Sequence, residues 1–351
     1  MKKIFMLLGL VFILSGCGKY NDKNLVKDIS KKVNDSKGYH MTATLEIFRN
    51  EEKYSYDVDS SYKKGDFFKV DLVNQNNNHE QIILKNDEGV YVLTPSLNKS
   101  FKFQSDWPYN NSQIYLLQPI ITDLNNDGDR TFEKNKSGYV LTSNVKYSTE
   151  KDFKKQKVYV DLDKNITKVE VLDSNDNVKM RLNVINIDYK AVFDDDYFKE
   201  SKYQTNDSQS KDTESKKEDN ITKEEEKDST NTNEKQSETG KIEDIVYPMY
   251  VPVDTHLSGQ DVVNTDAGER VILTFAGESS FTVIQENLSN ASSTNYVYGD
   301  PYLILDTVGT ITDYSVSWIS NGVEYSVMSD DMNIDELLTV AQSISVKAVG
   351  K

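Results

Sequence analysis

The sequence contains few of the residues on which disulfide frameworks, metal centres and nucleophilic catalysis depend. Among 351 residues there are one cysteine and three histidines. A single cysteine leaves no partner for a disulfide within the chain or for a cysteine-rich zinc site. The histidines stand alone in the sequence, and zinc-protease, nucleophile-elbow and glycine-rich phosphate-loop motifs are absent. No acid and base are paired by any motif, so we expect a protein that is not an enzyme and has no cofactor.

Positive charge and long apolar stretches are also scarce. Lysine and arginine number 41 against 57 aspartate and glutamate residues, which gives a formal net charge of -16. Binding nucleic acid through its phosphates needs a surplus of basic residues, so nucleic acid is excluded as a partner. A membrane-spanning helix needs a run of roughly eighteen apolar residues, and the sequence has none. A multi-pass membrane protein is therefore excluded as well.

The one long apolar segment lies at the start of the chain. Residues 1–17 have a basic start, an apolar run from Ile4 to Leu14 and small residues before Cys17, which are the three parts of a secretion signal. The Leu-Ser-Gly-Cys end resembles the lipobox of bacterial lipoproteins, which implies a signal peptide over 1–16 and a diacylglyceryl group on Cys17. An ordinary signal peptide that happens to end in cysteine is the alternative. The lipobox implies a lipid anchor on the outer face of the cytoplasmic membrane, with the forespore membrane as one such location.

A basic, amphipathic helix is predicted directly after the anchor, within residues 17–38. Its lysines and its apolar residues fall on two separate arcs at helical spacing. The basic arc holds Lys19, Lys23, Lys27 and Lys31. The apolar arc holds Leu25, Val26, Ile29 and Val33. The lysines either contact the anionic lipid surface or form an ordinary solvated face.

Residues 39–203 change to an alternation of period two, which predicts a mainly β domain of about ten strands joined by short turns. Short connections imply antiparallel neighbours, because parallel pairs need long crossovers. The predicted strands are 41–48, 54–60, 67–73, 81–84, 90–93, 101–103, 139–145, 157–161, 166–172 and 178–189. A helix is expected at 112–124, where Pro119 should kink or split it.

Residues 204–240 have a different composition from the segments on either side. Their only aliphatic residue is Ile221, and eleven acids outnumber six lysines. Such a segment cannot bury enough apolar surface to fold, so we predict a disordered acidic tether, with a polar surface helix as the alternative. Residues 241–351 follow as a small α+β domain, with strands at 270–275, 280–285, 302–306, 309–313, 314–319 and 323–329. A helix is predicted from the apolar stripe Ile334, Leu337, Leu338, Ala341 and Ile344.

One segment resembles half of a calcium-binding loop. Its oxygen-bearing side chains stand at alternate positions around Gly128, as calcium loops require. They are Asp123, Asn125, Asp127 and Asp129. The loop departs from the pattern at its twelfth position, where Lys134 replaces a bidentate glutamate. A calcium ion and a plain polar loop are the two interpretations.

Several short stretches resemble a known group of bacterial lipoproteins. Residues 82–85 and 89–99, with a Pro-x-x-Asn-Lys turn, look like the hairpin of LolA-like lipoproteins. Residues 184–189 and 193–198 are similar to the last strand and closing aromatic residue of that family. Residues 112–118 resemble the germination and sporulation lipoproteins of spore-forming Firmicutes. Residues 322–327 and 335–338 look like the terminal module of related sporulation lipoproteins and of some anti-sigma-type proteins.

This resemblance implies a mainly β, α+β fold: a half-open, curved antiparallel sheet with helices, followed by a small α+β domain. It also implies a membrane-anchored, non-enzymatic binding lipoprotein of sporulation or germination that docks or activates a cell-wall amidase. An acyl-chain carrier is one alternative, with an acyl chain as ligand. However, an acylated Cys17 would hold the chain in place, whereas a carrier must leave the membrane. An envelope regulator that senses a signal is the other alternative.

Overall fold

The computed structural model describes residues 20–49, 52–147, 150–204, 241–242, 244–266, 268–288, 293–304 and 306–344. The chain divides into two compact units, each made from two separate stretches of sequence. Unit 1 comprises Met1–Asp66 and Pro108–Phe193, and unit 2 comprises Phe67–Trp107 and Asp194–Lys351. This division runs through the segment 39–203. The units are not divided at the predicted bounds of the domains, 39–203 and 241–351, and those bounds stay a prediction.

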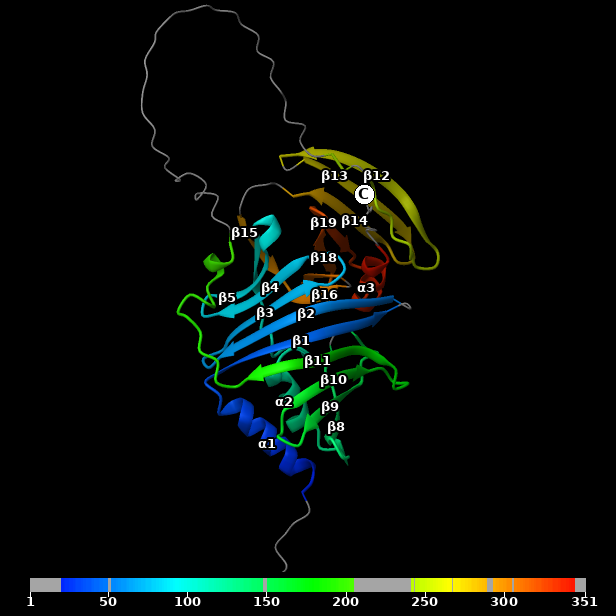
Figure 1. Ribbon diagram of the computed structural model, residues 1–351. Coiled ribbons are helices and arrows are strands. Elements are labelled where there is room, and N and C mark those ends of the chain that lie inside the picture. Colours follow the sequence, from blue (N-terminus) through cyan, green and yellow to red (C-terminus); the bar gives the residue numbers. More distant parts are fainter. Residues whose placement is uncertain are drawn as a thin grey trace, which may run out of the picture. The chain divides into compact units, whose positions relative to one another are not determined.

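Unit 1 is a strongly twisted antiparallel sheet with two helices (Figure 1). Its strands lie in the order β2-β1-β11-β10-β9-β8-β7, and every neighbouring pair is antiparallel. The helices are α1 (Asp22–Asn34) and α2 (Leu117–Asn126). The strands are β1 (Gly38–Arg49), β2 (Glu52–Lys63), β7 (Thr131–Lys134), β8 (Gly138–Asn144), β9 (Lys155–Asp161), β10 (Ile166–Leu172) and β11 (Val178–Asp188).

Helix α1 begins and packs as its sequence predicts. Asn21 and Asn24 form a capping box, in which each side chain accepts a hydrogen bond from the other residue's backbone N–H. The four residues of the apolar arc are buried. Lys32 secures the helix to unit 1 by donating to the backbone oxygen of Asp163 at 3.2 Å and to the side chain of Asn165. No helix in the described part of the chain is long and apolar enough to cross a bilayer.

The expected helix at 112–124 is wrong at its start. Helix α2 begins at Leu117, so Pro119 lies in its first turn, where a missing backbone N–H costs no helical hydrogen bond. Residues 112–116 instead follow a non-helical path, because Ser112 pairs with Lys146. The backbone N–H of Ser112 donates to the Lys146 oxygen at 2.7 Å, and the Lys146 N–H donates to the Ser112 hydroxyl at 2.7 Å.

Unit 2 contains two groups of strands (Figure 1). The first has the order β15-β6-β5-β4-β3, in which β15 runs parallel to β6 and the other neighbours are antiparallel. The second is an antiparallel, seven-stranded sheet in the order β12-β13-β14-β19-β18-β17-β16. Helix α3 (Ile334–Ser343) packs against β18 and β19.

The strands of unit 2 come from both stretches of sequence. The first stretch contributes β3 (Phe67–Asn74), β4 (Glu80–Asn86), β5 (Gly89–Thr94) and β6 (Lys99–Gln104). The second contributes β12 (Thr255–Thr265), β13 (Gly268–Gly277), β14 (Phe281–Asn287), β15 (Ser293–Tyr298), β16 (Asp300–Ile304), β17 (Thr307–Ile311), β18 (Ser315–Ser320) and β19 (Val323–Met328). Two short 3-10 turns, η1 (Pro95–Leu97) and η2 (Glu200–Lys202), complete the unit.

The mainly β, α+β class expected from the sequence is confirmed, with large curved sheets and few helices. The predicted Pro-x-x-Asn-Lys turn is built around η1, and Asn98 has the left-handed φ of 50° that asparagine tolerates well. Three strands, β7, β12 and β15, were not predicted. Of these, β15 also departs from the expected antiparallel pattern, because it joins β6 in parallel.

Candidate functional site

The inner face of the unit 1 sheet, which is the face toward α1 and α2, is filled by the unit's own side chains. Tyr39 donates its hydroxyl proton to Gln118 of α2 at 2.9 Å, and its oxygen accepts from the Leu117 N–H at 3.2 Å. Residues of the sheet and both helices on this face are completely buried. They include Leu25, Ile29, Met41, Leu45, Leu117, Leu124, Val158 and Leu182, each 0% exposed. This packing is a closed core.

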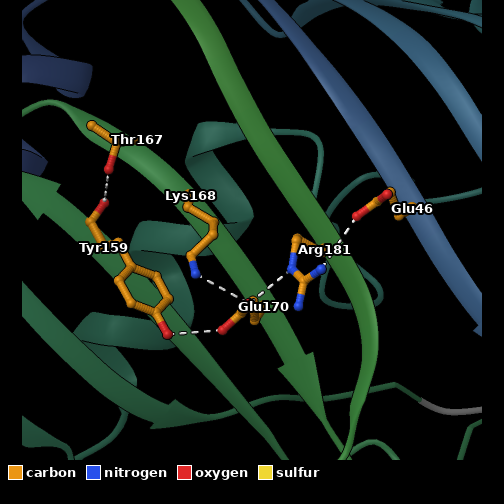
Figure 2. A network of polar contacts seen from close by, with 6 residues as sticks. All are labelled: Glu46, Tyr159, Thr167, Lys168, Glu170 and Arg181. Atoms are coloured by element: carbon orange, nitrogen blue, oxygen red, sulfur yellow. Dashed lines mark hydrogen bonds and ion pairs between the residues drawn. The ribbon is translucent and has the colours of Figure 1, made fainter.

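The opposite face of the same sheet carries a ladder of charged and polar groups (Figure 2). Glu46, Arg181 and Glu170 stand directly across from one another on β1, β11 and β10. Arg181 donates to Glu170 at 2.9 Å and to Glu46 at 3.3 Å. Tyr159 and Lys168 also donate to Glu170, at 2.8 and 3.2 Å. Cross-strand pairs of opposite charge stabilise a sheet, so this ladder joins three strands.

The charge state of Glu170 is set by these partners. Burial acts to raise the pKa of this carboxyl group, but the hydrogen bonds from Arg181, Tyr159 and Lys168 hold it below its usual value. The carboxylate is therefore ionised at neutral pH and is unsuited to act as a general acid. The ladder stabilises the sheet and shows no sign of catalytic chemistry.

The four candidate calcium ligands do not converge on one point. Asp123 and Asn125 lie within the last turns of α2, where the predicted loop should have begun. Asp123 accepts from the Ser112 hydroxyl at 2.7 Å, and the Asn125 amide donates to Ile121 and Ser30. Asp127 accepts from the backbone N–H groups of Asp129 and Asn144. No group of three metal-ligating side chains was found among the described residues. Calcium binding stays a prediction, and these contacts favour a structural role.

Burial changes the acidity of one of these residues. It raises the pKa of Asp123 to about 6, and the hydrogen bond from Ser112 opposes that rise only in part. The Gln156 amide also approaches this carboxyl group, at 3.5 Å. Asp123 is thus a half-buried acid of unit 1 whose pKa lies well above the usual value of an aspartate.

The basic arc predicted for the first helix is partly described. Lys23, Lys27 and Lys31 lie on α1 and are exposed. Cys17 and Lys19, together with the signal peptide 1–16, lie outside the described residues, as does the tether from residue 205 to residue 240. An exposed lysine arc is equally compatible with a lipid surface and with solvent, so both interpretations stay open.

Unit 2 contains a cavity of about 870 Å3. One wall is apolar and comes from the β5–β6 hairpin and β15. Val92 of β5 stands across from Phe101 of β6, and Phe103 follows on the same face of the hairpin. Val297 and Tyr298 of β15 extend this wall.

The opposite wall belongs to the seven-stranded sheet. This sheet buries Leu273, Val283 and Val327 in the core that contains α3. Alternate residues on β13, β14 and β18 line the cavity, and many of them carry hydroxyl groups. They are Thr274, Thr282, Ser315 and Ser317. Trp318 stacks on Tyr325 with ring centroids 5.4 Å apart and gives this wall a rigid aromatic element.

The charged groups that line the cavity are all acidic. Glu324, Asp330 and Asp331 are lining residues, and no lysine, arginine or histidine is among the described residues of the lining. Burial raises the pKa of Glu324, the neighbouring Glu286 raises it further, and Arg270 and Lys99 oppose the rise. Asp330 and Asp331 are exposed to solvent.

Thr94 supplies a buried polar group to this cavity. It is 1% exposed, and its hydroxyl oxygen has no hydrogen-bond partner in the described part of the chain. A buried hydroxyl without a partner costs free energy, on the order of 1–3 kcal/mol. Such a group is expected to find a partner when a ligand enters.

Gln81 holds the two groups of strands in unit 2 together. Its side chain, on β4, donates to the backbone oxygen of Val308 at 3.0 Å and accepts from the Val308 N–H at 2.5 Å. It also accepts from the Thr307 hydroxyl at 3.0 Å. No site was predicted here, because a glutamine at the start of an apolar strand gives no signal of its distant partner. The cavity was missed for the same reason.

No family model matches the chain. Solved structures with limited likeness include a MucA/MucB complex of Pseudomonas aeruginosa, 12% identical, which covers 92% of this chain and 97% of that chain with a TM-score of 0.33. A CwlD amidase in complex with the GerS lipoprotein from Clostridioides difficile is 21% identical, covers 50% of this chain and 99% of that chain, and has a TM-score of 0.31. These scores are too low to support an argument.

A sequence relative gives a much firmer relation. Sporulation protein YdcC of Bacillus subtilis (strain 168) is 32% identical over 346 residues, which cover 97% of this chain and 96% of that protein. The match extends over both compact units, and it confirms the resemblance to sporulation proteins. The chain belongs to the family of sporulation protein YdcC.

Proposed function

We propose that the protein is a lipid-anchored, non-enzymatic binding protein that acts in sporulation and docks or activates a cell-wall amidase. The observation that carries the proposal is the relation to a sporulation protein along nearly the whole of both chains. An anchor at Cys17 would keep the folded units next to the membrane, and two or more acyl chains are enough for stable attachment.

The geometry of unit 1 supports a binding role over transport of an acyl chain. A carrier needs an accessible apolar hollow, whereas the inner face of this sheet is completely buried by α1, α2 and neighbouring strands. Emptying this face would require both helices to leave their core. The acyl-carrier alternative therefore has no support from unit 1.

The contacts of two acidic groups suit a non-enzymatic role. The buried Glu170 and the half-buried Asp123 are both held by structural hydrogen bonds. The cavity of unit 2 is lined by hydroxyl, aromatic and carboxylate groups, with no histidine to serve as a base. This lining suits recognition of a partner.

The amidase as partner rests on the sequence resemblance of residues 112–118 to germination lipoproteins. In this chain Ile114, Leu116 and Leu117 of that stretch are buried. The stretch therefore serves the core of unit 1, and an amidase would have to contact another surface.

The first experiment tests the anchor. The full-length protein and its Cys17→Ala variant would be produced in a spore-forming host, and membrane and soluble fractions would be compared by immunoblot. We expect the wild-type protein in the membrane fraction and the variant either unprocessed or released. A Ser15→Ala variant serves as a matched control, since it keeps a small residue before the cysteine. If the Cys17→Ala variant is processed and remains in the membrane fraction like the wild-type protein, the proposal of a lipid anchor at Cys17 is wrong.

The second experiment tests the partner. The full-length, affinity-tagged protein would be crosslinked in sporulating cells, purified and analysed by mass spectrometry, with a Cys17-anchored unrelated domain as control. We expect a cell-wall amidase to be enriched, and we expect spores of a deletion strain to contain less muramic lactam. Normal muramic lactam together with no enriched amidase would overturn the amidase as partner.

A further inference from the structure

The cavity of unit 2 has a combination of walls that selects for one class of ligand. Its apolar wall, with Phe101 and Phe103, suits aliphatic or aromatic side chains. Its hydroxyl-rich wall, with Thr282 and Ser317, can donate to and accept from the amide groups of a peptide backbone. A volume of about 870 Å3 lies within the range that binds ligands well above the size of a single amino acid.

The charges in the lining narrow the class of ligand further. In the described part of the lining there are three carboxylates and no basic side chain. Residues 241–351, which form most of unit 2, contain sixteen acidic residues against four lysine and arginine residues. A phosphate, a fatty-acid carboxylate or an acidic peptide would find no counter-charge in the lining and would be repelled. A cationic side chain, in contrast, would meet carboxylates at Asp330 and Asp331 and aromatic faces nearby.

The buried hydroxyl of Thr94 gives an independent sign that the cavity is built for a ligand. Thr94 belongs to the lining of the cavity, is almost fully buried, and its hydroxyl has no partner among the described residues. It can accept a hydrogen bond from a peptide N–H or donate one to a peptide C=O. Its burial without a partner is a cost that a bound peptide would remove.

We propose that this cavity binds an extended peptide segment of a protein partner, one that alternates apolar and lysine or arginine side chains. This inference rests on the proposed binding function and names the chemistry of the partner. The apolar side chains lie against the β5–β6 wall, the backbone against the hydroxyl-rich wall, and the cationic groups beside Asp330 and Asp331.

Fluorescence anisotropy with the full chain tests the proposal. The probe is a labelled hexapeptide of alternating lysine and phenylalanine, with matched peptides that carry glutamate or glutamine in place of lysine. We expect the lysine peptide to bind at least ten-fold more tightly than the glutamate peptide, with the glutamine peptide between them. The advantage should shrink as salt is added, because exposed charges are screened.

Two variants locate the site, and one matched variant serves as control. Asp330→Asn together with Asp331→Asn should weaken binding of the lysine peptide at least three-fold and flatten its salt dependence, with no change in the glutamine peptide. Thr94→Val removes the unpartnered hydroxyl at nearly constant volume and should weaken all bound peptides alike. Asp261→Asn removes an exposed carboxylate on β12, outside the lining, and should change nothing.

Three results would overturn the proposal. They are equal binding of the glutamate and lysine peptides, unchanged binding in the variant that lacks both aspartates, and binding of a neutral chitin hexasaccharide in place of all three peptides. The last result would assign the cavity to a sugar. If none of the peptides binds while an amidase is still enriched from sporulating cells, the proposal for the cavity is refuted and the proposed function stands.

Discussion

The two compact units use their sheets in opposite ways. Unit 1 covers the inner face of its sheet with α1 and α2 and closes it completely. Unit 2 covers one face of its seven-stranded sheet with α3 and leaves a cavity of about 870 Å3 against the other. A curved sheet alone therefore does not make a binding site. A sheet face stays open for binding only where the chain supplies no helix whose apolar stripe covers that face.

The largest effect that separates the two units should come from truncating a large side chain in each. Leu45→Ala in the closed core of unit 1 should lower the free energy of unfolding by about 2–5 kcal/mol, because it leaves a cavity in a fully buried site. Phe101→Ala, in the wall of an existing cavity, should cost clearly less. Urea denaturation of both variants would check this. Equal losses of unfolding free energy in the two variants would contradict the contrast between the closed sheet face of unit 1 and the open cavity of unit 2.

The next effect concerns the side chain that joins the two groups of strands in unit 2. Gln81→Leu removes three hydrogen bonds and leaves the Val308 backbone groups buried without partners, so we expect a loss of about 2–4 kcal/mol. Thr307→Val removes one of these bonds and should cost less than half as much. Hydrogen exchange at β4 and β17 should rise in Gln81→Leu, with unit 1 unchanged. A uniform rise in exchange across both units would argue against two separate compact units.

A smaller, pH-dependent effect should be confined to unit 1. The pKa of Asp123 is raised to about 6 in the folded protein, above its value of 3.8 in an unfolded chain. The folded state therefore holds this proton more tightly, so the free energy of unfolding falls as pH rises from about 4 to about 6 and then levels off. Asp123→Asn should flatten this part of the pH profile and leave Tm at pH 7.5 equal or higher. An unchanged profile would show that the carboxyl group titrates normally.

The smallest effect is expected on the outer face of unit 1. Arg181→Gln breaks the ladder between Glu46 and Glu170, yet the side chain of Arg181 is 33% exposed, so solvent screens much of its interaction. We expect a loss of about 1 kcal/mol that shrinks at high salt. Lys53→Gln, which removes a more exposed partner of Glu46, serves as a control and should cost less. A loss of several kcal/mol would contradict the expectation that solvent screens the interactions of Arg181.

The local sequence pattern was sufficient to predict most of the strands and the apolar stripes of α1 and α3. Period-two alternation located β1 and β11, and the apolar arc of α1 is buried as predicted. The predicted start of α2 was wrong because Ile114 and Leu117 fit a helical spacing, whereas Ser112 pairs with Lys146 and the helix begins only at Leu117. A tertiary contact decided that boundary, and sequence spacing does not contain it.

The cavity could not be predicted because its walls come from distant stretches of sequence. Val92 and Phe101 are ordinary apolar strand residues, and Thr282 and Ser317 are ordinary polar ones. Strand β12 was missed because it buries neither face and so lacks the alternation by which strands are recognised. Only the pairing of strands reveals that these residues share a site.

The hydrogen bonds of Gln81 also bear on how the chain reaches its folded state. They connect residues separated by 227 positions, so β3 to β6 are made early in synthesis but cannot be completed until β17 has been made. Contacts between residues far apart in sequence slow folding, because a long loop must close before they form. Unit 2 should therefore be the slower unit to fold, with its first strand edges exposed to association in the meantime. Unit 1 also pairs distant strands, since Thr42 of β1 stands across from Asn186 of β11, but its closing loop is the shorter of the two.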